Sequence, residues 1–83
     1  MNKNQLEFPR LLREKQEKLG LNNKEFATYL GKTRAWLTYI YNGDFSKAHK
    51  LAEYNMIELH NLLDIPFEVM LDYNISIIKN RGA

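Results

Sequence analysis

Residues 22–43 read NNKEFATYLGKTRAWLTYIYNG, and the start and stop signals in this stretch predict two short helices separated by a turn. Asn22 is a favoured N-cap residue, and Glu25 follows it at the spacing of a capping box. Gly31 can adopt the positive φ angle that a tight turn requires. Thr33 is the expected N-cap of the second helix. A pair of short helices joined by a glycine turn is typical of a helix-turn-helix unit.

The second of these helices has an inner and an outer face. At about 100° per residue, Leu37 and Ile40 fall on one side, and Trp36 lies beside them. The opposite side carries five residues that the helix turns outward together: Arg34, Ala35, Thr38, Tyr39 and Asn42. In a helix-turn-helix, here expected at residues 22–42, the outer face of the second helix enters the DNA major groove.

Three further helices are expected, so the predicted fold class is all-α with five helices. The first runs from about Asn4 or Phe8 to Leu19, because apolar residues recur there at helical spacing. A longer helix is expected from Ser46, an N-cap residue type, to Leu63. Pro66 is expected to begin the last helix, since proline is tolerated in a first turn.

The C-terminal residues 74–83 are expected to form a tail beside a DNA-binding domain of residues 1–73. Residues 75–78 fit either a strand, because their β-branched side chains alternate, or a continuation of the last helix. An exposed apolar pair on the preceding helix and the isoleucines of this tail are the candidate contacts of a homodimer: Tyr54, Ile57, Ile75 and Ile77.

Composition favours one small cytoplasmic domain with no cofactor or metal. A chain of 83 residues is sufficient for a single domain, and it has no cysteine for a disulfide or a thiolate metal site. No apolar run approaches the roughly 18 residues of a membrane span. Residues 1–5 lack the apolar stretch of a secretory signal. Because no catalytic motif is found either, we do not expect an enzyme.

Charge is distributed unevenly along the chain. Residues 1–50 hold ten Lys or Arg and five Asp or Glu, a net +5, whereas residues 51–83 hold two and five, a net −3. The basic half contains the expected helix-turn-helix, which suits a protein that meets phosphate groups with one side. The alternative is a solvated surface whose charges cluster by chance.

Residues 20–43 resemble the helix-turn-helix of the Cro/repressor family, the lambda-repressor-like domains. The residues at the family's motif spacing are Gly20, Leu21, Ala27, Gly31, Thr33, Leu37, Ile40 and Gly43. The resemblance implies a five-helix domain that binds a pseudo-palindromic operator as a homodimer and regulates transcription, most often as a repressor. This chain departs from the pattern at Lys32, where the family has an apolar residue, and at Asn23, where it usually has glutamine.

The candidate site is a double-stranded DNA interface with base-reading and phosphate-binding residues. By resemblance, the base-contacting positions are Arg34, Ala35, Thr38 and Tyr39. A guanidinium can bond both O6 and N7 of guanine, so arginine is the strongest of these candidates. The candidate phosphate contacts are Asn23 and Asn42, by resemblance, and three lysines, by charge: Lys24, Lys32 and Lys47. Each lysine is equally compatible with a free surface position.

A protein-binding module with the same fold, such as an antitoxin subunit or an anti-repressor, is the alternative function. The second helix of the unit is unusually aromatic, with Trp36, Tyr39 and Tyr41. Aromatic side chains are frequent anchors of protein interfaces. Salt dependence separates the two hypotheses, because binding to phosphates weakens steeply with salt.

Overall fold

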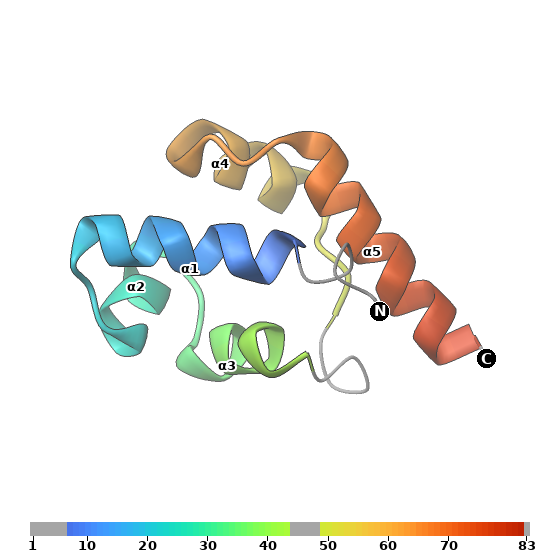
Figure 1. Cartoon of the computed structure of the whole chain (residues 1–83), viewed down its shortest axis with the longest axis horizontal. Helices are drawn as coiled ribbons and strands as arrows, with labels where there is room; N and C mark the ends of the chain where they lie inside the picture. The colour runs from blue at the N-terminus through green and yellow to red at the C-terminus, as the bar shows by residue number, and fades with distance from the viewer. Residues whose placement is uncertain (1–6, 44–48, 83) are drawn as a thin grey trace.

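The computed structural model describes residues 7–43 and 49–82, and within these residues the chain forms five helices and no strand (Figure 1). The all-α prediction is therefore confirmed. In chain order the helices are α1 (Glu7–Leu19), α2 (Asn23–Leu30), α3 (Arg34–Asn42), α4 (Glu53–Leu63) and α5 (Phe67–Gly82).

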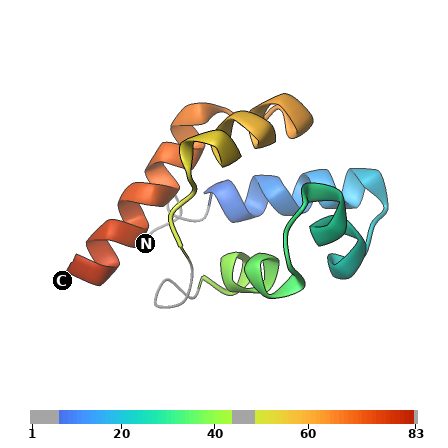
Figure 2. The ribbon, with the colours of Figure 1, turned by 180° about the vertical axis from the view of Figure 1, so that it is seen from behind.

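One apolar core holds the five helices together. Helix α1 packs against α3 and α5, α2 packs against α3, and α4 packs against α5. Figures 1 and 2 show α4 on one side of α1 and the α2–α3 pair on the other, while α5 crosses one end of the molecule. The largest fully buried side chains come from α1, α2, α3, α5 and the α4–α5 loop: Phe8, Leu12, Phe26, Leu37, Ile40, Ile65, Met70, Tyr73 and Ile77. Burying each apolar side chain contributes roughly 1.5–3 kcal/mol, so α3 is anchored through its inner face.

The local signals around α2 and α3 are confirmed. The Asn22 side chain accepts a hydrogen bond from the backbone N of Glu25 at 2.8 Å, and the Glu25 side chain accepts one from the backbone N of Asn22 at 2.9 Å. Thr33 Oγ1 accepts from the backbone N of Trp36 at 3.1 Å. Gly31, with φ of 73°, ends α2 in the left-handed conformation that glycine adopts without strain.

The predicted start of the fourth helix is wrong. Helix α4 begins at Glu53 rather than near Ser46, which lies outside the described residues, and residues 49–52 are not helical. The Asn74 side chain explains the difference. Its Oδ1 accepts from the backbone N of Leu51 at 2.7 Å, and its Nδ2 donates to the Leu51 carbonyl at 3.0 Å. A side chain that satisfies both backbone groups of one residue replaces the hydrogen bonds that a helix would supply there.

Of the two alternatives for residues 75–78, the structure shows the continuation of the last helix. Helix α5 runs without a break from Phe67 to Gly82, and the strand alternative for residues 75–78 is wrong. Ile77 follows Met70 and Tyr73 at helical spacing, so continuing the helix buries all three side chains on one face. A strand would instead have turned Ile75 and Ile77 to the same side. Across the described ranges, none of the helices combines the length and apolarity required to traverse a bilayer.

Candidate nucleic-acid interface

The outer face of α3 is open at its first turn and partly covered further along. Arg34, Ala35 and Asn42 are exposed, whereas Thr38 and Tyr39 are half-buried. Thr38 Oγ1 donates to the carbonyl of Arg34 at 2.9 Å, so this hydroxyl keeps only acceptor capacity and its methyl group for an outside partner. The first turn of α3 therefore offers the least obstructed side chains.

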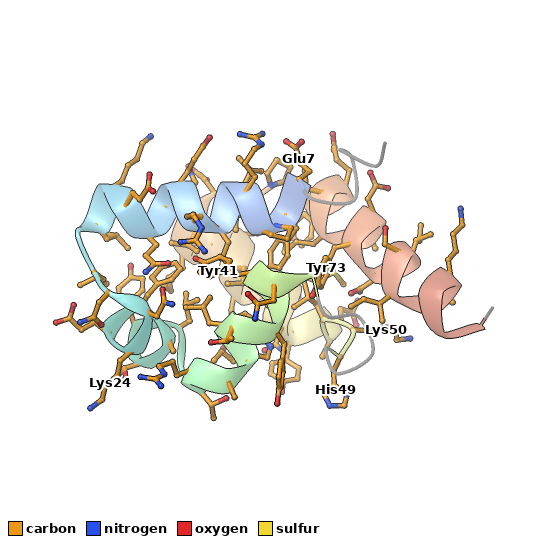
Figure 3. The ribbon with its side chains drawn as sticks, turned by 60° about the horizontal axis from the view of Figure 1, so that its bottom comes forward. Glu7, Lys24, Tyr41, His49, Lys50 and Tyr73 are labelled. Atoms are coloured by element: carbon orange, nitrogen blue, oxygen red, sulfur yellow. The ribbon has the colours of Figure 1, made fainter. Side chains whose placement is uncertain are left out.

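A basic groove lies beside this first turn, between α2 and α3. Its volume is about 390 Å³, and its lining residues are Lys24, Ala27, Thr28, Lys32, Thr33 and Arg34. The small Ala27 is buried where α2 meets α3, which brings the two helices close enough for cations from both to share one groove. Figure 3 shows Lys24 projecting from α2 away from α1. The groove is thus lined by three cationic residues from two helices and the turn between them.

The cations of the groove have no acidic partners within the described residues. The ion pairs in this part of the chain both involve Arg10 of α1, which contacts Glu7 at 2.9 Å and Glu14 at 2.7 Å. Helix α3 itself contains no acidic residue. The positive charge of Lys24 and Arg34 is therefore not neutralised locally, and it attracts anionic ligands.

Lys32 has a structural contact that the sequence did not reveal. Its Nζ donates to Oδ1 of the buried Asn55 in α4 at 2.6 Å. The same ammonium lies 5.6 Å from the ring centroid of Trp36 and 5.8 Å from that of Tyr54. Lys32 therefore links the turn between α2 and α3 to α4. The phosphate contact of Lys32 stays a prediction, with one of its three donors already used.

Asn23 is half-buried and its side chain is held by Gln16 of α1, which sequence reasoning missed. Gln16 Nε2 donates to Asn23 Oδ1 at 2.8 Å and to the Leu21 carbonyl at 3.1 Å. Gln16 Oε1 accepts from the hydroxyl of Tyr41 in α3 at 2.6 Å. The sequence did contain an indication that Gln16 is buried, because Gln16 continues the helical spacing of the buried Phe8 and Leu12.

Tyr41 lies between α1 and α3 (Figure 3). The guanidinium carbon of Arg13 lies 4.0 Å from its ring centroid, within the range of a cation–π contact. Burial raises the pKa of Tyr41 to about 12, while the charge of Arg13 opposes this shift and that of Glu17 adds to it. The phenol therefore stays protonated and remains a hydrogen-bond donor over the physiological pH range.

The raised pKa of Tyr41 predicts a loss of stability in alkali. Because its folded-state pKa of about 12 exceeds the ordinary value of 10, its contribution is complete below pH 10 and is lost as pH rises towards 12. Burial also raises the pKa of Tyr73, which acts in the same direction. We expect the urea midpoint, followed by circular dichroism, to fall between pH 10 and 12. The fall should be smaller in Tyr41→Phe, and equal falls in the two proteins would contradict the buried hydroxyl.

The structure changes the set of candidate dimer contacts. Tyr54, Ile57 and Ile75 are exposed, with Tyr54 at 64%, but Ile77 is only 1% exposed and belongs to the core. Ile77 was therefore a wrong prediction for a surface contact. The exposed large apolar residues of α5 are Phe67, Leu71, Ile75 and Ile78. The sequence interpretation had named the last helix and residues 75–78 as possible dimer contacts, but of these four residues it had singled out only Ile75.

The aromatic residues proposed as anchors of a protein-binding module face partly inward. Trp36, Tyr39 and Tyr41 are each half-buried and pack against the apolar core. Tyr41 is further occupied by Gln16 and Arg13. Three aromatic side chains engaged in this way offer less free surface than the sequence suggested.

Two remaining predictions concern residues at the edges of the site. Asn42 is exposed at the end of α3, and Lys47 lies outside the described residues. In the portion of the chain that the structure describes, no cluster of three or more His, Asp or Glu is placed to hold a metal ion. Comparison of the chain with protein-family models, with curated proteins and with solved structures finds no match.

Proposed function

We propose that this chain is a sequence-specific DNA-binding regulator of transcription with a lambda-repressor-like helix-turn-helix. The observation that carries this proposal is the first turn of α3. There Arg34 is exposed, lies beside a groove that it shares with Lys24 and Lys32, and has no acidic partner among the described residues. A cationic groove next to an exposed helix face is the arrangement that meets a DNA backbone and a major groove together.

Within this proposal the two ends of the interface have different tasks. Arg34 and Ala35, at the start of α3, reach base edges, since the N-terminal residues of a recognition helix make these contacts. Thr38 accepts a hydrogen bond from a base or packs its methyl group on thymine, because its proton is used within the helix. Lys24 neutralises a phosphate, and Asn42 contacts the backbone near the other end of α3.

We further propose that the regulator binds as a symmetric dimer through α5. One α3 covers only a few base pairs, and a pair of half-sites lies about 34 Å apart. At about 100° per residue, Phe67, Leu71, Ile75 and Ile78 fall within an arc of about 80°, separate from the arc of the buried Met70, Tyr73 and Ile77. Figures 1 and 2 show the C-terminal end of α5 directed toward the side of the molecule that carries α3. This apolar stripe, hereafter the α5 stripe, can thus pair two subunits while leaving both recognition helices free.

Selection of bound DNA from a random pool tests the proposal. We expect an enriched sequence with two-fold symmetry, and an affinity for it that falls linearly with salt on logarithmic axes. If the three candidate lysines of each subunit neutralise about six phosphates in a dimer, binding should weaken about 1,000-fold between 50 and 200 mM salt. No enrichment, together with no retention on heparin or DNA resin at low salt, would instead support the protein-binding module.

A further inference from the structure

Gln16 makes three side-chain hydrogen bonds inside the protein. It is 6% exposed, and it joins α1 to the α1–α2 loop, to α2 and to α3 through Leu21, Asn23 and Tyr41. The two N–H groups of Nε2 go to two acceptors, and Oε1 receives one donor. An amide buried with complete partners has a fixed orientation.

One backbone carbonyl sets the direction of every bond in this network. The Leu21 carbonyl can only accept, so the Gln16 atom facing it must be Nε2. The second hydrogen of Nε2 then points to Asn23, whose facing atom must be the acceptor Oδ1. On the other side Oε1 faces Tyr41, whose hydroxyl must therefore donate. The chain of donors runs from Tyr41 through Gln16 to Asn23.

We propose that Gln16 is a positioning residue for the DNA interface, because its bond to the side-chain carbonyl of Asn23 fixes the orientation of this amide and leaves both Asn23 N–H donors for an outside ligand. This inference rests on the proposed function. The N–H groups suit a phosphate oxygen, which can only accept. If Asn23 were free to turn over, its carbonyl would face the phosphate in part of the population, and the contact would weaken.

The proposal accounts for three features of this chain together. Asn23 is shorter than the glutamine that is usual at this position of the resembled family, and a hydrogen bond from Gln16 orients its amide. A polar residue stands on the otherwise apolar inner face of α1. Tyr41 ends the network with a hydroxyl that burial keeps protonated, so the direction of the bonds does not change near neutral pH.

A double-mutant cycle on the selected operator tests the inference. Gln16→Met keeps the length of the side chain but removes its donors, and we expect it to weaken operator binding about tenfold, as for loss of a hydrogen bond to a charged group. Asn23→Ala should have a similar effect. The double variant should bind no more weakly than Asn23→Ala alone, because both changes remove the same phosphate contact.

A second readout separates positioning from a general structural role. A neutral methylphosphonate placed at each backbone position of a half-site should weaken wild-type binding at every contacted phosphate, and one of these positions is the contact of Asn23. Only the Asn23 position should lose its effect in both Gln16→Met and Asn23→Ala, whereas the position contacted by Lys24 should keep its effect. Asn61→Ala, which removes an exposed amide from α4, is the control and should leave the whole pattern unchanged.

The outcomes distinguish the inference from the proposed function. If the wild-type protein binds no DNA, the proposed function itself is wrong. Wild-type binding with additive effects of Gln16→Met and Asn23→Ala, or with an unchanged methylphosphonate pattern in Gln16→Met, overturns the positioning role alone. If circular dichroism shows that Gln16→Met does not fold, Gln16→Glu supplies the same comparison, because its carboxylate can still accept from Tyr41 but has no N–H to donate to Asn23 Oδ1.

Discussion

Replacing Arg34 with alanine is expected to weaken binding to each operator half-site by about 5- to 150-fold, the range that corresponds to 1–3 kcal/mol for one bidentate contact to guanine. The preference for guanine at one position of each half-site should relax at the same time. The physical reason is that Arg34 is exposed in the first turn of α3, where a planar fork of donors can reach O6 and N7 together. Fluorescence anisotropy titrations against the selected operator and its single-base variants measure both effects.

Two matched variants separate base reading from charge. Arg10→Ala removes the same side chain and the same charge from α1, where Arg10 is paired with Glu7 and Glu14, and it should leave the base preference unchanged. Arg34→Lys keeps the charge but not the bidentate geometry, so it should retain part of the affinity and lose most of the preference for guanine. If Arg34→Ala keeps both the affinity and the base preference of the wild type, the recognition role of Arg34 is excluded.

Leu71→Glu is expected to give a monomer and to lower operator affinity about 10²- to 10⁴-fold, because the second half-site no longer benefits from being linked to the first. Leu71 lies in the middle of the α5 stripe and is 49% exposed, so a charged side chain can be solvated there in the free subunit. In a dimer the same charge would be buried in the apolar contact, which is strongly unfavourable. Sedimentation equilibrium gives the oligomeric state. Comparison of the affinities for operators with one and with two half-sites gives the affinity that is gained by linking the two subunits.

Ile57→Glu is the control for this experiment and also tests the other candidate surface. Ile57 is exposed on α4, beside Tyr54 in the apolar pair that the sequence suggested. If the α5 stripe is the dimer surface, Ile57→Glu should remain dimeric and bind normally. If Ile57→Glu is monomeric and Leu71→Glu is dimeric, the dimer contact lies on α4 instead. If the wild-type protein stays monomeric both free and on DNA, the proposal of a dimer is wrong.

The geometry of the candidate interface was predictable from sequence to the extent that it depends on helix periodicity and capping. Arg34 and Ala35 are exposed as the 100° arc predicted, and Leu37 and Ile40 are buried. The half-buried Tyr39 and the internal bond of Thr38 were not predictable, because they depend on what packs beside α3. The same holds for Lys32, whose partner Asn55 is distant in sequence.

The sequence by itself determined the α2–turn–α3 unit, because its capping box, its glycine turn and its apolar spacing each act within a few residues. Tertiary structure decided the rest. The start of α4 depends on the Asn74 side chain binding the Leu51 backbone, and the helical form of residues 74–82 goes with burial of Ile77 in the shared core. The orientation of Asn23 depends on Gln16 and Tyr41, which come from two other helices. These contacts join residues that come close together only after the helices have packed. No local sequence pattern therefore predicts them.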